Sequence, residues 1–139
     1  MTMSNIIENY IENNHFGKHL GMEFKIIVPG HIEYYLNPAV QLEAMEGMIH
    51  GGAIAGFMDG ILGVAALSAV EDQNKLVATI EFKINYLKPI FTNQPLIGVG
   101  KVLQQGKSTI VVEGKIMCGM ELKVCALGTF KAYHKDNKK

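Results

Sequence analysis

One segment, Met48 to Val70, constrains the fold of this chain more than any other, because it is apolar and rich in glycine yet carries a carboxylate, Asp59. The segment opens with His50-Gly51-Gly52, and Asp59 lies too far along it to cap a helix N-terminus. Burying an ionised carboxylate without partners costs several kcal/mol or forces it to take up a proton. We therefore favour a functional role for Asp59 over that of a solvated or purely structural acid.

The stretch from Gly51 to Val70 is also long enough to be tested as a membrane span. Asp59 near its centre and five glycines make it a poor one, so the sequence favours a helix buried in a globular core. The N-terminal region carries Glu8 and Glu12 where a secretory signal would carry basic residues and then an apolar run. We expect no membrane association and a cytoplasmic location.

Length and composition predict one globular domain over residues 1–139. Hydrophobic residues at 48% and charged residues at 19% lie outside the range of disordered chains. Thirteen lysines balance thirteen acidic residues, so the basic field that nucleic-acid binding requires is absent. Because the sequence has no arginine, a ligand phosphate would have to be met by lysine, by backbone N–H groups or by a helix N-terminus.

The two cysteines, Cys118 and Cys125, flank Gly119-Met120, which reads as a two-residue hairpin turn. That turn would place Cys118 opposite Glu121, and Cys125 opposite Gly114, so the two thiols would not face each other. Neither cysteine has the neighbouring His and Cys residues that a metal site would need. We expect free thiols, no metal and no cofactor.

Ahead of the apolar segment, the sequence predicts a short helix and a hairpin. Ser4 can cap a helix that ends at Asn13-Asn14 and carries apolar residues at helical spacing, namely Ile6, Ile7, Tyr10 and Ile11. We expect residues 1–20 to form a helical flap. Two β-rich runs, Glu23–Val28 and His31–Leu36, flank a Pro-Gly turn signal and predict a hairpin.

Four strands are predicted after the apolar segment. The first alternates, with Ala78, Ile80, Phe82, Ile84 and Tyr86 expected on one face and Thr79, Glu81, Lys83 and Asn85 on the other. Short turns join the next three, Leu96–Leu103, Ser108–Met117 and Glu121–Tyr133. The charged tail, His134–Lys139, is expected to fray.

This order of elements predicts an α+β fold in which a curved antiparallel sheet wraps around one long helix. One sheet covers only one side of a helix that is apolar on most sides, so the remaining side needs a second subunit or the curl of the sheet itself. Gly52, Gly56, Asp59 and Gly63 form a thin stripe along this helix. Close approach of another subunit and tight packing within the chain explain that stripe equally well.

These features together resemble a known family. The pattern is Gly47-x-x-His50-Gly51-Gly52, then Asp59 and Gly63, then the strand Thr79–Tyr86, Lys88-Pro89 and the turn Gly106-Lys107-Ser108. It is similar to hotdog-fold acyl-coenzyme A thioesterases of the phenylacetate-pathway type, over nearly the whole chain. The resemblance implies the hotdog fold, a homodimer that pairs into a tetramer, and hydrolysis of an acyl- or aryl-acyl-CoA to the free acid and CoA.

The resemblance also implies residue roles. The backbone N–H of Gly51, at the N-terminus of the central helix, would polarise the thioester carbonyl, as the positive end of a helix dipole can. Asp59, from the facing subunit, would be the general base or nucleophile, and Thr79 would orient the attacking water. His50 would shape the turn into the helix, with catalysis by His50 the less favoured alternative. Substrate contacts would come from Gly52, Asn85, Tyr86, Lys88, Pro89, Gly106, Lys107 and Ser108, with Lys107 as the first candidate for a phosphate.

One position departs from the family. Six residues before His50, relatives often carry Asn or Gln to help hold the carbonyl, and here the residue is Ala44. Loss of one oxyanion donor costs about a hundredfold or more in rate. A catalytically weak protein that binds acyl-CoA as a sensor or carrier is therefore the alternative to a thioesterase. A hotdog dehydratase or hydratase fits less well, since those enzymes pair a catalytic His with an acid in a different local pattern.

Overall fold

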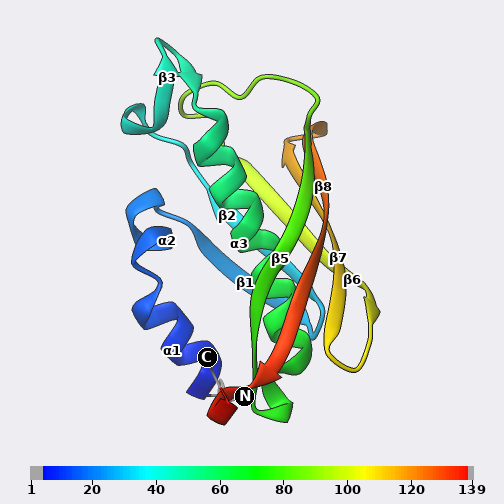
Figure 1. Ribbon diagram of the computed structural model, residues 1–139. Coiled ribbons are helices and arrows are strands. Elements are labelled where there is room, and N and C mark those ends of the chain that lie inside the picture. The colour runs from blue at the N-terminus through cyan, green and yellow to red at the C-terminus, as the bar shows by residue number, and fades with distance from the viewer. Residues whose placement is uncertain (1–4, 138–139) are drawn as a thin grey trace.

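The computed structural model describes residues 5–137, and a curved antiparallel sheet wrapped around a long helix dominates it (Figure 1). The sheet has six strands in the order β1-β2-β6-β7-β8-β5, and β3 and β4 form a separate two-stranded ribbon. The helices are α1 (Asn5–Asn13), α2 (His15–Leu20) and α3 (Gly51–Val70). The strands are β1 (Glu23–Val28), β2 (His31–Leu36), β3 (Glu43–Met45), β4 (Met48–Ile49), β5 (Lys75–Tyr86), β6 (Leu96–Gln105), β7 (Thr109–Cys118) and β8 (Glu121–His134). Short 3-10 turns cover Val40–Leu42, Glu71–Gln73 and Lys135–Asn137.

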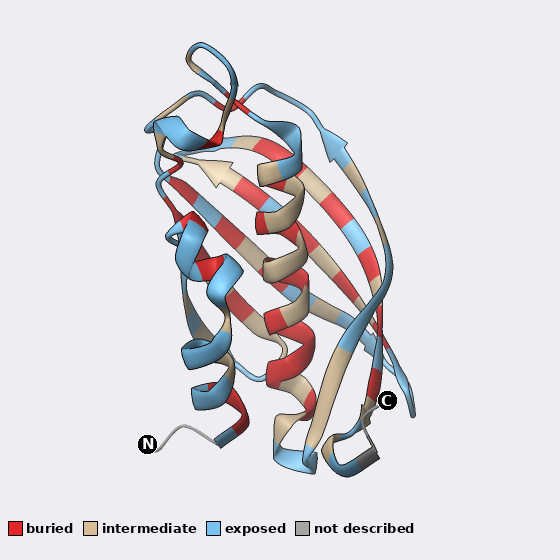
Figure 2. Cartoon of the chain, turned by 60° about the vertical axis from the view of Figure 1, so that its left-hand side comes forward, coloured by how far each residue is buried: buried red, intermediate tan, exposed pale blue. Residues whose placement is uncertain are grey.

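Helix α3 is the core of the molecule, as the sequence predicts. Its side chains Phe57, Met58, Ile61 and Leu62 are fully buried, and the helix packs on all six strands of the sheet and on α2. Buried positions gather on α3 and along the strands that it packs against (Figure 2). Residues 51–73 are long and apolar enough to cross a membrane, but 61% of that apolar window is buried within this fold.

Helix α3 packs close to the sheet because glycines of β6 and β7 face it. A Cβ on Gly100 of β6 would lie 2.7 Å from the carbonyl oxygen of Ile61, and one on Gly114 of β7 would lie 2.5 Å from Met58 Sδ. Real Cβ atoms essentially never come so near, so a larger residue at Gly100 would push the helix off the sheet, and one at Gly114 would force the Met58 side chain to move.

Part of the glycine stripe on α3 serves packing within the chain. A Cβ on Gly56 would lie 2.6 Å from Phe16 Cζ of α2, and one on Gly60 would lie 2.6 Å from Met22 Cε. The segment that follows α1 therefore packs Phe16 against Gly56 and Met22 against Gly60. Of the two explanations open for Gly56, the structure supports tight packing inside the chain.

The hairpin of β1 and β2 is confirmed, with Gly30 in its turn at φ 86°. The predicted alternation of β5 is wrong in its first half, because a β-bulge at Ile80 interrupts the pairing with β8. Ile80 is 54% exposed, whereas Thr79 turns toward α3, on the same side as Phe82. A bulge inserts one extra residue and re-aims the neighbouring side chain, and the sequence alone does not reveal it.

A second bulge corrects the predicted register of the cysteines. Cys118 lies opposite Glu121 as predicted, but a register shift between Ile116 and Met117 places Cys125 opposite Lys115 instead of Gly114. Both thiols are free and half-buried.

The N-terminal region holds two helices instead of the one that the sequence predicts. Asn14 caps α2, its side-chain oxygen accepting from the Gly17 N–H at 3.1 Å, so the predicted break is a junction between helices. Ile6 and Ile7 are buried, but Ile11 is 41% exposed. The predicted cap, Ser4, lies outside the described residues. Both helices run beside α3 (Figure 2).

The sequence reading also omits the ribbon of β3 and β4, which is too short to show periodicity. The predicted fraying of His134–Lys139 is wrong for the described part: His134 belongs to β8, Lys135–Asn137 form a 3-10 turn, and the Lys135 N–H donates to the Asn74 carbonyl at 2.9 Å. Residues 138–139 lie outside the described residues.

Candidate active site

The N-terminus of α3 presents one backbone donor without an acceptor. The Gly52 N–H donates to His50 Nδ1 at 2.7 Å, and the N–H groups of Ala53 and Ile54 donate to the His50 carbonyl at 3.0 and 3.2 Å. Within residues 5–137, the Gly51 N–H has no hydrogen-bond acceptor. It lies at the positive end of a 20-residue helix, so it is the group of this turn that can receive an oxyanion.

The His-Gly-Gly sequence has a local structural reason. His50 is the N-cap of α3 with an extended backbone, at φ −61° and ψ 132°. A Cβ on Gly52 would lie 2.9 Å from His50 Nδ1, so glycine lets the ring reach the helix N-terminus. Because Nδ1 accepts a hydrogen bond, His50 has a capping role here, in agreement with the shaping role expected for it.

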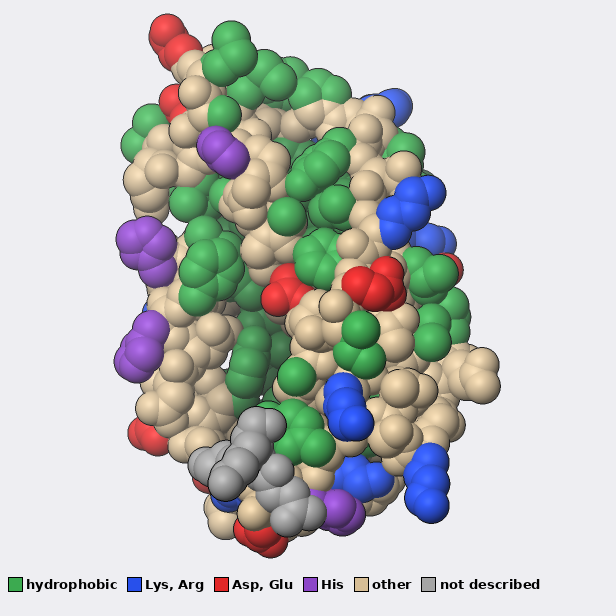
Figure 3. All heavy atoms as spheres, viewed as in Figure 1, with side chains coloured by type: hydrophobic (Ala, Val, Ile, Leu, Met, Phe, Trp, Pro, Cys, Tyr) green, Lys and Arg blue, Asp and Glu red, His purple; other side chains and the backbone are tan. Residues whose placement is uncertain are grey.

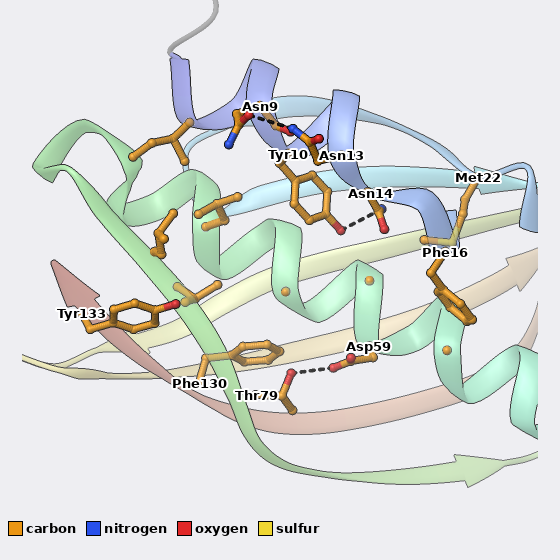
Figure 4. Close-up of a pocket in the computed structure, with 17 residues that line it drawn as sticks. Asn9, Tyr10, Asn13, Asn14, Phe16, Met22, Asp59, Thr79, Phe130 and Tyr133 are labelled. Atoms are coloured by element: carbon orange, nitrogen blue, oxygen red, sulfur yellow. Dashed lines mark hydrogen bonds between the residues drawn. The ribbon is translucent and has the colours of Figure 1, made fainter. Parts of the chain in front are cut away.

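Asp59 and Thr79 form the second half of the site. The Thr79 hydroxyl donates to Asp59 Oδ1 at 2.8 Å, joining α3 to β5 next to the bulge (Figure 4). Asp59 is half-buried in the single chain, less than its apolar sequence neighbourhood suggests. Its second carboxylate oxygen remains available to a water molecule or a substrate, and the Thr79 oxygen can still accept a hydrogen bond.

Asp59 and Thr79 open into a cavity of about 690 Å³, which we call the chamber. Residues from α1, α2, α3, β5 and β8 line it, and its members include Ile6, Tyr10, Phe16, Gly63, Leu67 and Phe130. Figure 3 shows that this face is hollowed between the N-terminal helices and β5, with hydrophobic side chains lining the hollow. The cavity has the size of a small-molecule site, and its lining combines hydrophobic side chains with polar ones.

A polar cluster lies on the α1 side of the chamber. Asn14 Nδ2 donates to the Tyr10 hydroxyl oxygen at 3.1 Å, and Tyr10 is also hydrogen-bonded to Tyr34. Burial raises the pKa of both phenols, and the charge of Asp59 raises that of Tyr10 further. Both phenols are therefore neutral at physiological pH, and Asp59 is the one carboxylate among the described residues that line the chamber.

The two halves of the site cannot meet within one chain. Eight residues of helix separate Gly51 from Asp59, which at 1.5 Å per residue is about 12 Å. A catalytic base and an oxyanion donor must both lie about 3 Å from the same reacting group. One thioester can therefore use both residues only if they come from different subunits.

The structure groups some of the predicted substrate contacts and separates others. Gly51, Tyr86, Lys88 and Pro89 line a smaller cavity of about 170 Å³ at the N-terminus of α3, and the Tyr86 hydroxyl donates to the Gly51 carbonyl at 2.7 Å. Asn85 is exposed nearby on β5. The turn 106–108 lies at the far end of β7, about 33 Å away along ten residues of strand. Gly106, Lys107 and Ser108 of one chain therefore do not join this group.

Lys88 is not a free cation. Its Nζ pairs with Glu121 Oε2 at 2.8 Å, and the buried Lys123 pairs with Glu121 Oε1 at 2.7 Å and donates to the Pro89 carbonyl at 3.0 Å. Lys123 first and then Lys88 lower the pKa of Glu121 from 4.5 to about 2. This network anchors the segment after β5 beside the N-terminus of α3.

Ala44 is exposed on β3 and offers no side-chain donor. The adjacent Glu43 is occupied, since it accepts the Thr92 hydroxyl at 2.5 Å. Neither residue replaces the Asn or Gln of the family.

Sequence reasoning missed Asn14, Phe16 and Lys123. At the chamber, Phe16 packs against Gly56 and Asn14 donates a hydrogen bond to Tyr10. Lys123 is the buried lysine that pairs with Glu121. The glycine stripe of α3 was a signal for Phe16, because a glycine on a helix face marks a close neighbour. Nothing in the local sequence points to the other two.

Comparison with known proteins places the chain. The family model of the thioesterase superfamily matches residues 46–125, which include His50, Asp59 and Thr79. The chain belongs to the thioesterase superfamily. It is a thioester hydrolase with the hotdog fold, and both expectations from the sequence resemblance are confirmed.

Individual relatives agree with this placement. The chain is 32% identical over 125 residues to "Putative esterase SSO1253" of Saccharolobus solfataricus, covering 85% of this chain and 77% of that protein. Thioesterase HI1161 of Haemophilus influenzae superposes with a TM-score of 0.82 at 19% identity, covering 96% of this chain and 93% of the other. The E. coli PaaI protein from the phenylacetic acid degradation operon gives a TM-score of 0.80 at 21% identity, covering 91% and 90%. The two structural likenesses show the fold.

Proposed function

We propose that this thioesterase hydrolyses an acyl- or aryl-acyl-CoA to the free acid and CoA, with Asp59 of one subunit and the Gly51 N–H of the partner subunit acting on one thioester. The observation that carries the proposal is the hydrogen bond from Thr79 to Asp59 at the opening of an apolar chamber. A carboxylate fixed in this way, with one oxygen free, is suited to acid–base chemistry beside an apolar acyl group.

The geometry favours Asp59 as a general base. A water molecule placed between the free carboxylate oxygen and Thr79 Oγ1 would donate one proton to each, so that a lone pair points at the thioester carbonyl. Asp59 takes the proton as the C–O bond forms, and the partner's Gly51 N–H receives the negative oxygen. The C–S bond then breaks, the thiolate of CoA leaves, and it takes the proton back from Asp59.

Direct attack by Asp59 as a nucleophile is the other route, and a single turnover in ¹⁸O-water separates the two. A general base puts the label into the first acid released. A nucleophile passes an unlabelled aspartate oxygen to that product when water attacks the aspartyl carbonyl.

A homodimer supplies the second half of the site. Strand β5 is an edge strand of 12 residues that pairs only with β8, so its other edge is free to pair with the same strand of a second copy. Exposed apolar side chains on the outer face of the sheet, including Tyr35, Ile97 and Leu127, support the further pairing of dimers into a tetramer. We place this assembly in the cytoplasm, which two free thiols favour.

The test is thiol release from acyl-CoAs by the wild-type protein and by Asp59→Asn, which keeps the size of the side chain. We expect the variant to lose about a hundredfold or more of kcat. Circular dichroism and the thermal midpoint check that it folds. Unaltered turnover in Asp59→Asn would refute the assignment.

The second candidate function is binding without turnover, and Ala44 favours it because it removes one carbonyl donor. No thiol release from any acyl-CoA, with acyl-CoA still bound in calorimetry, would move the assignment to a sensor or carrier. Restoring the donor with Ala44→Asn would then raise turnover.

A further inference from the structure

The depth of the chamber beside Asp59 indicates the length of the acyl group that fits in it. We infer that the preferred substrates carry an uncharged acyl group of about eight to ten carbon atoms, and that Gly63 is the residue that sets access to the far part of the chamber. This inference rests on the proposed function, because Asp59 marks where the thioester carbonyl lies.

The direction of the acyl group follows from the position of Asp59. Figure 4 shows Phe16 on one side of Asp59 and Tyr133 on the other. Phe16 packs against Gly56 and closes the chamber on the N-terminal side of Asp59, whereas Gly60, Gly63 and Leu67 line it farther along α3. An acyl chain whose carbonyl is held at Asp59 therefore has room only toward Leu67.

The depth follows from helix geometry. Eight residues separate Asp59 from Leu67, which gives about 12 Å. Ile6 and Leu67 are buried together at this end, and Leu76 packs on them. An extended alkyl chain advances by about 1.25 Å per carbon, because bonds of about 1.5 Å zigzag at the tetrahedral angle. The wall of Ile6, Leu67 and Leu76 therefore stops a straight chain after about eight to ten carbons.

Charge restricts the acyl group further. Among residues 5–137, those that line the chamber include one carboxylate, Asp59, and no lysine. A second carboxylate at the end of the acyl chain would have to leave water without a cation to meet it, in the same cavity as Asp59. Dicarboxylic acyl groups are therefore excluded, while straight-chain and arylacetyl groups fit.

Gly63 controls passage through the middle of the chamber. It lies four residues beyond Asp59, about 6 Å along the helix. A Cβ there would lie 3.5 Å from Phe130 Cε2, an ordinary contact, so the first carbon of a side chain fits without displacing the backbone. Because that carbon already touches Phe130, we expect the two methyl groups of valine to project into the chamber and leave room for about four carbons.

The test compares kcat/KM for butyryl-, octanoyl- and palmitoyl-CoA, and for the eight-carbon acyl-CoA that ends in a carboxylate. For the wild type we expect octanoyl-CoA to exceed palmitoyl-CoA and the carboxylated analogue by about tenfold or more each. Gly63→Val should lower the ratio of octanoyl to butyryl by about tenfold. Leu76→Ala, which opens the end wall at a half-buried position, should raise the ratio of palmitoyl to octanoyl.

Leu103→Ala is the matched control, since Leu103 is 56% exposed on β6, away from the chamber, and the chain-length profile should not move. Equal rates on octanoyl- and palmitoyl-CoA, or an equal loss on every chain length in Gly63→Val, would overturn the inference while leaving the thioesterase intact. Turnover that persists in Asp59→Asn, or no hydrolysis of any acyl-CoA by the wild type, would instead overturn the proposed function itself.

Discussion

Two adjacent glycines at the start of α3 have different reasons to be glycine. Gly52 makes room for the His50 ring, which a Cβ would meet at 2.9 Å. A Cβ on Gly51 would meet only ordinary contacts, 3.7 Å or more from the Tyr86 ring. Gly51 matters instead through its N–H, which the other hydrogen bonds of the turn leave unused.

Gly51→Pro tests that donor with little structural change. Proline is favoured at the first position of a helix, and its predecessor, His50, already has the extended backbone that proline requires. We expect kcat to fall by about a hundredfold or more, since one oxyanion donor is removed. Gly51→Ala keeps the N–H and should stay close to wild type in the same thiol-release assay. Equal losses in both variants would contradict a role for the N–H.

Glu121 gives a prediction about stability and pH. Its pKa is about 2 in the folded chain and 4.5 ordinarily, so its two ion pairs stabilise the fold above pH 4.5 and are lost as the pH falls toward 2. Glu121→Gln leaves the buried Lys123 without its carboxylate, so its urea unfolding midpoint at pH 7 should fall below that of wild type. The difference should close near pH 2. Glu23→Gln, at an exposed position, is the control, and a difference that persists in acid would argue against the ion pairs.

At this scale the sequence predicts the residues whose chemistry is unusual for their setting. Asp59 stands out in an apolar helix, and the His-Gly-Gly run marks the helix start. Asn14 could not be found in this way, because its part in the chamber depends on a tertiary contact with Tyr10 and its type is ordinary at a helix junction.

Among the elements, β5 determines how Thr79 meets Asp59. Without the bulge at Ile80, strict alternation would put Thr79 and Phe82 on opposite faces, and one of them would leave the α3 side. The extra residue restores both to the same face. The strand therefore places Thr79, which has a proposed catalytic role, on the same face as the core residue Phe82, although strict alternation would separate them.

Two single-residue deletions test this reading of β5. Deleting Ile80 removes the extra residue and leaves Thr79 and Phe82 two positions apart, both facing α3. Deleting Lys83 puts Phe82 and Ile84 on opposite faces and turns an apolar side chain out. We expect the Ile80 deletion to unfold at a higher temperature than the Lys83 deletion. Both deletions shorten β5 by one residue. If the Ile80 deletion unfolded at the lower temperature, the bulge could not be what brings Thr79 and Phe82 to the same face.

The sequence predicts long elements well and short or coupled ones poorly. The span of α3 and the hairpin of β1 and β2 follow from apolar runs and turn residues. The ribbon of β3 and β4, the second N-terminal helix and the two bulges depend on pairing and packing with distant residues, and local patterns do not record them.

For the molecule as a whole, the division of the site matters most. In the proposed mechanism, each chain carries a base at Asp59 and a donor at Gly51, about 12 Å apart on one helix. A dimer with twofold symmetry would contain two sites, each combining Asp59 of one subunit with Gly51 of the other. We therefore expect activity to be a property of the pair of chains.

A hybrid dimer tests this claim most directly. Subunits carrying Asp59→Asn and subunits carrying Gly51→Pro are co-expressed with different affinity tags, and the mixed dimer is purified and assayed for thiol release. Each parent alone should be nearly inactive, while the hybrid contains one intact site, with Asp59 from one chain and Gly51 from the other. It should recover about half of the wild-type rate per dimer. A hybrid as inactive as its parents would mean that the two residues do not act across the subunit interface, and the account would be wrong.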